Sequence, residues 1–98
     1  MRTIWKFPIG LIQQQKISMP RGAVIRHVAN NPIQGGGCLW AEVDTDAPLE
    51  PRMILIFGTG GQQFVASDPD YPILGPRYIG TFMTGSLVWH VYEVPRGT

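Results

Sequence analysis

The sequence predicts an all-β domain, a small antiparallel sandwich or barrel of six to seven short strands with little or no helix. Three observations predict this class. Apolar residues alternate with polar ones or form short continuous runs, which is the pattern of strands. The 12 glycines and 9 prolines interrupt the chain at close intervals, as turns do. No stretch of useful length shows the 3.6-residue period of an amphipathic helix. Short strands between closely spaced turns are typical of sandwiches and barrels.

Four strands are expected before residue 45, at residues 3–7, 14–18, 23–29 and 39–44. Pro, Gly or Asn residues, which favour turns, bound each of them. The second is the weakest, and a short helix over residues 10–15 is an alternative for that part of the chain. The fourth alternates strictly, so Trp40 and Glu42 should lie on one face and the apolar residues between them on the other.

Three strands are expected after residue 50, at residues 53–57, 77–83 and 87–94. Residues 46–51 are expected to form a polar connection that contains two prolines. The run at 53–57 is apolar throughout, as in a strand covered on both faces, so we expect it to be central and buried. Residues 66–76 contain three prolines and predict a loop, and residues 84–86 predict a hairpin turn between the last two strands.

Length and composition restrict the class of protein. A chain of 98 residues corresponds to one domain, residues 1–98, with a small core. The net charge of +1 gives no field that would attract DNA, RNA or an anionic membrane. Only 15% of the residues are charged, which favours burying part of the surface in a dimer or tetramer. The first residues show neither a signal peptide nor a membrane span, so we expect a cytoplasmic protein.

The residues that catalysis or metal binding would need are scarce. Cys38 is the only cysteine, so no disulfide forms within the chain, and a buried small side chain is its commoner role. His27 and His90 are far apart in the sequence and do not form a ligand cluster with one thiol. We therefore expect no catalytic residue, no metal and no cofactor.

The sequence Gly58-Thr59-Gly60-Gly61 follows the apolar run and raises the question of a phosphate-binding loop. A Walker loop needs a Lys and a Ser or Thr after its glycines, followed by a helix, and this chain has neither there. A dinucleotide fingerprint needs a βαβ unit, which the pattern does not predict. Two interpretations remain open: a plain turn at the end of a strand, or a nest of backbone N–H groups that binds an anion.

Several other residues could form a binding surface. Trp40 and Trp89 each share a strand face with a carboxylate, and a face of aromatic and charged side chains suits base stacking or an interface. Arg26 and His27 lie in mid-strand and should point to opposite faces, where the guanidinium is either solvated or directed at an anion. The expected ligand-binding residues are Arg26, His27, Trp40, Gly58, Thr59, Gly60, Arg77, Tyr78, Thr81, Trp89 and His90.

Six short motifs occur along the chain: Thr-Ile-Trp-Lys at 3–6, Pro-x-Gly-Ala at 20–23, Cys-Leu-Trp-Ala at 38–41 with Val-Asp at 43–44, Gly-Thr-Gly at 58–60, Tyr-Ile-Gly-Thr-Phe at 78–82 and Leu-Val-Trp-His-Val at 87–91. Their order and spacing resemble a family of short bacteriophage and prophage proteins. That family is similar to the phage sponges that act against the CBASS defence system. The resemblance implies an oligomeric anti-defence protein of the infected bacterial cytoplasm. It would sequester a cyclic dinucleotide or related nucleotide signal without cleaving it.

Two other classes remain open. The first is a protein-binding module that inhibits a host protein and uses the acidic stretch at residues 42–50 as a decoy surface. The second is a hydrolase of the same signals, with His27 or His90 as general base. Binding to nucleic acid ranks last, because the net charge is near zero.

Overall fold

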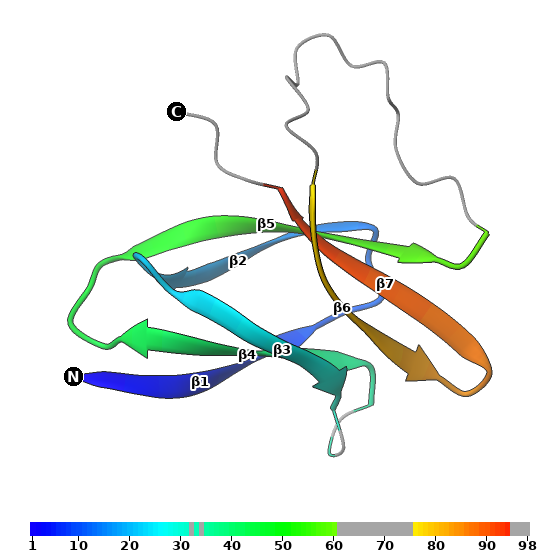
Figure 1. Cartoon of the computed structure of the whole chain (residues 1–98), viewed down its shortest axis with the longest axis horizontal. Coiled ribbons are helices and arrows are strands. Elements are labelled where there is room, and N and C mark those ends of the chain that lie inside the picture. The colour runs from blue at the N-terminus through cyan, green and yellow to red at the C-terminus, as the bar shows by residue number, and fades with distance from the viewer. Residues whose placement is uncertain (32, 34, 61–75, 95–98) are drawn as a thin grey trace, which may run out of the picture.

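A computed structural model describes residues 1–31, 33, 35–60 and 76–94 and confirms the all-β, sandwich-like class (Figure 1). The described residues form seven strands in two antiparallel sheets and no helix. The strands are β1 (Arg2–Ile9), β2 (Gln14–Pro20), β3 (Val24–Asn30), β4 (Gly37–Asp44), β5 (Leu49–Gly58), β6 (Arg77–Thr84) and β7 (Leu87–Val94). The first sheet has the order β1-β4-β3 and the second has the order β2-β5-β7-β6.

The structure corrects two of the expected elements. A helix over residues 10–15 is wrong, because β2 begins at Gln14. The connection expected at residues 46–51 is too long, because β5 begins at Leu49 and includes Pro51. Pro51 lies opposite Ser18 of β2, and the pairing of β5 with the described residues of β7 ends at Met53, so no described neighbour on that side needs an N–H from Pro51. The expected loop over 66–76 lies outside the described residues, except for residue 76.

The core lies between the two sheets. Leu39, Ala41 and Val43 of β4 are fully buried on one side of it, and Ile54 and Ile56 of β5 are buried on the other. β5 lies between β2 and β7, so the expected central position of this strand is confirmed. Ile54, Ile56 and Phe57 are buried, whereas Met53 and Leu55 are only partly buried, so the strand is not fully covered on both faces. Cys38 is also buried, as expected.

The two sheets come together along β3 and β6 (Figure 1). Here the Asn30 side chain of β3 makes two hydrogen bonds to the backbone of Met83 in β6. Its amide donates to the Met83 carbonyl, and its oxygen accepts from the Met83 N–H at 3.3 Å. Further along, a Cβ on Gly80 would lie 2.5 Å from the Cβ of Val28, so only glycine permits the close approach.

An ion pair occupies one end of the core. The Arg52 guanidinium bonds to both carboxylate oxygens of Glu93 and donates to the Ala23 carbonyl at 2.8 Å. The Arg52 and Glu93 side chains are only 15% and 9% exposed. Trp89 is partly buried and shares this side of β7 with Glu93, so the expected face of an aromatic residue and a carboxylate is directed at the core.

Candidate functional site

The outer face of the first sheet carries three of the expected site residues. The Arg26 guanidinium donates two hydrogen bonds to the Glu42 carboxylate, with N–O distances of 3.0 and 3.2 Å. His27 lies opposite Trp40, and the ammonium of Lys6 lies 5.8 Å from the centre of the Trp40 ring. A register shift before His27 brings Arg26 and His27 to the same face. The expectation that they point to opposite faces is therefore wrong.

The charge of Arg26 on this face is already balanced. The hydrogen bond to Glu42 raises the pKa of Arg26, and the hydrogen bond from Arg26 lowers the pKa of Glu42. The Glu42 carboxylate occupies Nε and one Nη of the guanidinium, and the remaining N–H groups of Arg26 stay accessible. A phosphate on the outer face of the first sheet would therefore meet a carboxylate beside the guanidinium.

Three more of the expected residues lie on the core-facing side of the second sheet. The Trp89 ring packs against the core and donates its indole N–H to the Thr84 hydroxyl at 2.8 Å. A Cβ on Gly58 would lie 3.4 Å from that ring, so Gly58 makes room for it. Arg77 lies at the rim, where its side chain is 63% exposed and 3.4 Å from Glu93. Gly58 and Trp89 are therefore packing residues, and Arg77 is the one solvent-accessible charge of the three.

The outer face of the second sheet carries a row of aromatic rings. Tyr78 and Tyr92 meet edge to face with ring centres 5.5 Å apart, and Phe57 and Tyr92 meet in the same way at 6.0 Å. The Tyr78 hydroxyl bonds to the Thr81 hydroxyl. Phe57 is buried, whereas Tyr78 is 53% exposed. The row therefore presents one exposed ring that its neighbours hold in place.

A Thr–His pair lies beside this row. The Thr59 hydroxyl and Nε2 of His90 are 2.6 Å apart. His90 lies between Phe57 of β5 and Thr81 of β6 in the sheet register. The pairing of β7 with β5 and with β6 thus brings together residues that are far apart in the sequence.

The turn at the end of β5 is less open than a nest would be. The backbone N–H of Thr59 donates to the Val88 carbonyl at 3.3 Å. Gly60 has a φ of 80°, a conformation that favours glycine, and Gly61 lies outside the described residues. The Thr59 N–H is therefore already engaged and does not point at an anion, which weakens the interpretation of this turn as a nest. What the turn offers instead is the Thr59 hydroxyl.

We call this surface the aromatic–hydroxyl face, and define it as Phe57, Thr59, Tyr78, Thr81, His90 and Tyr92. Its charge distinguishes it from the outer face of the first sheet. Among the described residues, the outward positions of β2, β5, β6 and β7 include Lys16 but no Asp or Glu. An anion on this face would therefore meet no repelling carboxylate from them.

A model of the family described as "Domain of unknown function (DUF7352)" matches residues 1–98. The chain belongs to this family. No curated protein and no solved structure matches it.

Sequence reasoning identified four members of the aromatic–hydroxyl face and missed two. Thr59, Tyr78, Thr81 and His90 were expected, and the structure brings them together. Tyr92 and Phe57 were not expected in the site, because aromatic residues in strands more often belong to the core. The alternation that places Tyr92 on the same face as His90 was the available signal.

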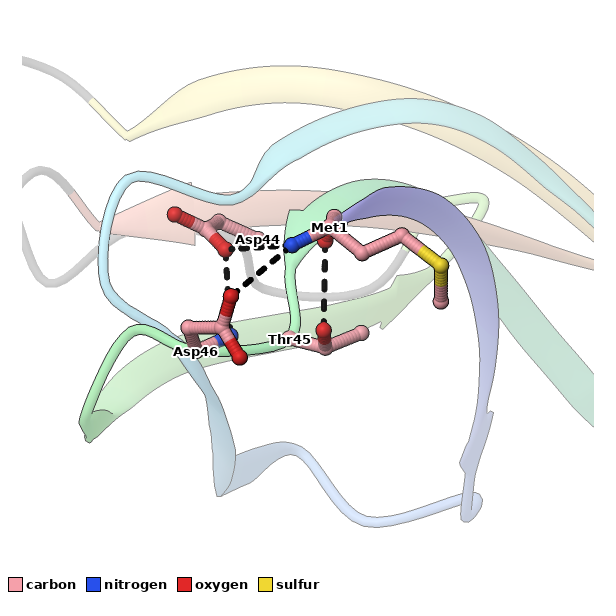
Figure 2. Close-up of polar contacts among 4 residues, drawn as sticks. All are labelled: Met1, Asp44, Thr45 and Asp46. Carbon is pink, nitrogen blue, oxygen red and sulfur yellow. Dashed lines mark hydrogen bonds and ion pairs between the residues drawn. The ribbon is translucent and has the colours of Figure 1, made fainter.

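The acidic stretch at residues 42–50 is engaged within the chain. The Met1 ammonium lies 2.9 Å from Asp46 and 3.4 Å from Asp44, and the Thr45 hydroxyl donates to the Met1 carbonyl at 3.2 Å (Figure 2). The hydrogen bond to Asp46 raises the pKa of the Met1 ammonium. Glu42 bonds to Arg26, and Glu50 also has an interaction partner. This DUF7352 chain therefore does not present the stretch as a row of free carboxylates.

Thr59 and His90 have the spacing of a nucleophile and its base. Such a pair also needs a group that orients the imidazole, usually a carboxylate, and the described part of this face contains none. No three His, Cys, Asp or Glu side chains of the described residues gather closely enough to hold a metal ion. Within the same described ranges, no helix has the length and hydropathy of a membrane span.

Proposed function

We propose that the chain is a non-catalytic binding protein that sequesters a nucleotide signal on the aromatic–hydroxyl face. Cyclic dinucleotides are the first candidates, and the role is anti-defence in the cytoplasm of a phage-infected bacterium. The observation that carries the proposal is the Tyr78 ring. It is exposed, held by Tyr92 and Thr81, and lies in the same sheet face as the Thr59–His90 pair.

The chemistry of the face matches the parts of a nucleotide. Stacking of a base on an aromatic side chain contributes about 1–3 kcal/mol. Because Tyr78 is already fixed by its neighbours, little conformational freedom is lost on binding. The Thr59 and Thr81 hydroxyls and the His90 ring can bond to ribose and phosphate oxygens. Arg77 at the rim can turn toward a phosphate, since Glu93 would keep Arg52 as its partner.

A second copy of the chain completes the proposal. Small-molecule sites bury about 70–90% of the ligand surface, whereas one sheet face contacts the ligand from one side only. A second subunit would cover the other side, so we expect a dimer or tetramer with the ligand at the interface. Low surface charge supports such association.

The other two classes receive less support from the geometry. A decoy surface requires free carboxylates, but the acids at residues 42–50 have partners within the chain. A hydrolase requires an oriented base. No carboxylate of the described residues lies on the face of His90, and Glu42, on the face of His27, bonds to Arg26.

Calorimetry against a panel of cyclic dinucleotides tests the proposal. At least one should bind, and Tyr78→Ala should weaken it about tenfold, from the lower half of the stacking range. Two matched controls, Met83→Ala on the same strand and Trp40→Ala on the outer face of the first sheet, should bind as the unchanged chain does. Native mass spectrometry should show the ligand on a dimer or tetramer. Absence of binding to every member of the panel would contradict the proposal, and loss of binding in Trp40→Ala alone would place the site on the first sheet.

A further inference from the structure

Among the described residues, the sheet neighbours of His90 include no Asp, Glu, Lys or Arg. Phe57 lies opposite on β5, Thr81 lies opposite on β6, and Tyr92 follows on the same face of β7. Thr59 bonds to the ring from the turn after β5. Tyr78 and Tyr92 are the other titratable side chains of the aromatic–hydroxyl face.

The nearest charged side chain in the outward positions of the second sheet is distant along the strands. Lys16 of β2 lies opposite Met53, whereas His90 lies opposite Phe57 at the other end of β5. None of the described residues places a carboxylate on this face to balance an imidazolium. A proton on His90 would therefore place a positive charge beside Thr59 that no carboxylate of the described residues offsets.

The Thr59–His90 hydrogen bond changes direction with that proton. When the neutral ring carries its proton on Nδ1, Nε2 accepts a bond from the Thr59 hydroxyl. When both nitrogens are protonated, Nε2 must donate, and the Thr59 oxygen becomes the acceptor. The Thr59 proton is then free to point at a ligand. Protonation thus adds a charge and releases a hydroxyl donor at one place.

We propose that Thr59 and His90 form a phosphodiester subsite that binds more tightly when His90 is protonated. This inference rests on the proposed function and identifies which part of the nucleotide this pair takes. A phosphodiester keeps its single negative charge throughout the range of about pH 5–8 in which histidines titrate. Its affinity therefore reports the protonation of the protein alone.

Cyclic AMP and adenosine are suitable probes, because they share a base and differ in the phosphodiester. Binding of each to the full chain is measured by calorimetry at several values between about pH 5.5 and 8. Cyclic AMP should bind about tenfold more tightly at the acidic end, which is the difference between a neutral and a charge-assisted hydrogen bond. Adenosine should bind with the same affinity throughout.

The chain has two histidines, and the second provides a matched control. His90→Gln keeps a hydrogen-bonding side chain but cannot be protonated, so it should remove the pH dependence of cyclic AMP binding. His27→Gln, on the outer face of the first sheet, should keep the pH dependence.

The outcomes separate this inference from the function on which it depends. Equal affinity of cyclic AMP at both ends of the pH range, with adenosine still bound, overturns the inference and leaves the aromatic site intact. A pH dependence that survives His90→Gln also overturns it. Failure of both probes and of every cyclic dinucleotide to bind overturns the inference and the proposed function together.

Discussion

Replacing Arg52 with Met tests how the ion pair in the core stabilises the sandwich. The substitution keeps the length and apolar stem of the side chain and removes its charge. Glu93 is 9% exposed and would retain only Arg77, at 3.4 Å. The Ala23 carbonyl would lose its 2.8 Å bond to Arg52. A nearly buried carboxylate would thus lose its main partner.

The magnitude follows from these contacts. Breaking a buried pair by removing one partner costs about 3–5 kcal/mol, and the remaining contact with Arg77 favours the lower value, about 3. The lost hydrogen bond to the Ala23 carbonyl contributes about 1 kcal/mol of this cost. The double variant Arg52→Met with Glu93→Leu has no charge left in the core. It should therefore cost only about 1 kcal/mol, less than Arg52→Met alone.

Urea denaturation of the wild-type chain and the variants measures these differences. With a slope of about 1.5 kcal/mol per M, Arg52→Met should lower the midpoint by roughly 2 M. Arg26→Met breaks the exposed pair with Glu42 and serves as the control, with a far smaller shift. A double variant whose cost equals the sum of the two single costs would refute the coupling of Arg52 and Glu93.

Three other predictions concern the fold. Gly80→Ala places a methyl group 2.5 Å from the Cβ of Val28 and should cost about 1–3 kcal/mol in urea denaturation, whereas an unchanged midpoint would mean that β3 and β6 lie further apart. Ile56→Asp buries an unpaired charge at a side chain that is 4% exposed and should abolish folding, so a soluble variant that unfolds cooperatively would contradict the central position of β5. The contact of the Met1 ammonium with Asp46 raises its pKa above the ordinary value of 8.0, so its contribution to stability is complete below pH 8 and is lost as the pH rises through the raised pKa. Thermal unfolding at increasing pH should show this loss in the wild-type chain and a smaller one in Asp46→Asn.

Local patterns predicted most of the fold, because they depend on side chains within one strand. The strand expected at residues 87–94 has the same bounds as β7. The continuous apolar run that includes Ile54 and Ile56 is central, as expected. The extension of β5 to Leu49 could not be predicted in this way, because Pro51 argues against a strand unless the missing neighbour is known.

The rest depended on pairing between distant parts of the chain. Arg52 and Glu93 are 41 residues apart, and neither has a local signal of burial. The register shift in β3, which alternation cannot reveal, moved Arg26 and His27 to one face. Seven of the eleven expected site residues therefore lie outside the aromatic–hydroxyl face, because sequence proximity does not determine which sheet face they share.

NMR chemical-shift mapping with a cyclic dinucleotide tests the central claim most directly, since it reports where on the surface a ligand binds. The backbone signals that move should cluster at Thr59, Tyr78, Thr81 and His90, with those of Trp40 unmoved. Shifts that cluster around Trp40 and leave Tyr78 unmoved, or no shifts at millimolar ligand, would contradict the claim that the aromatic–hydroxyl face binds nucleotides.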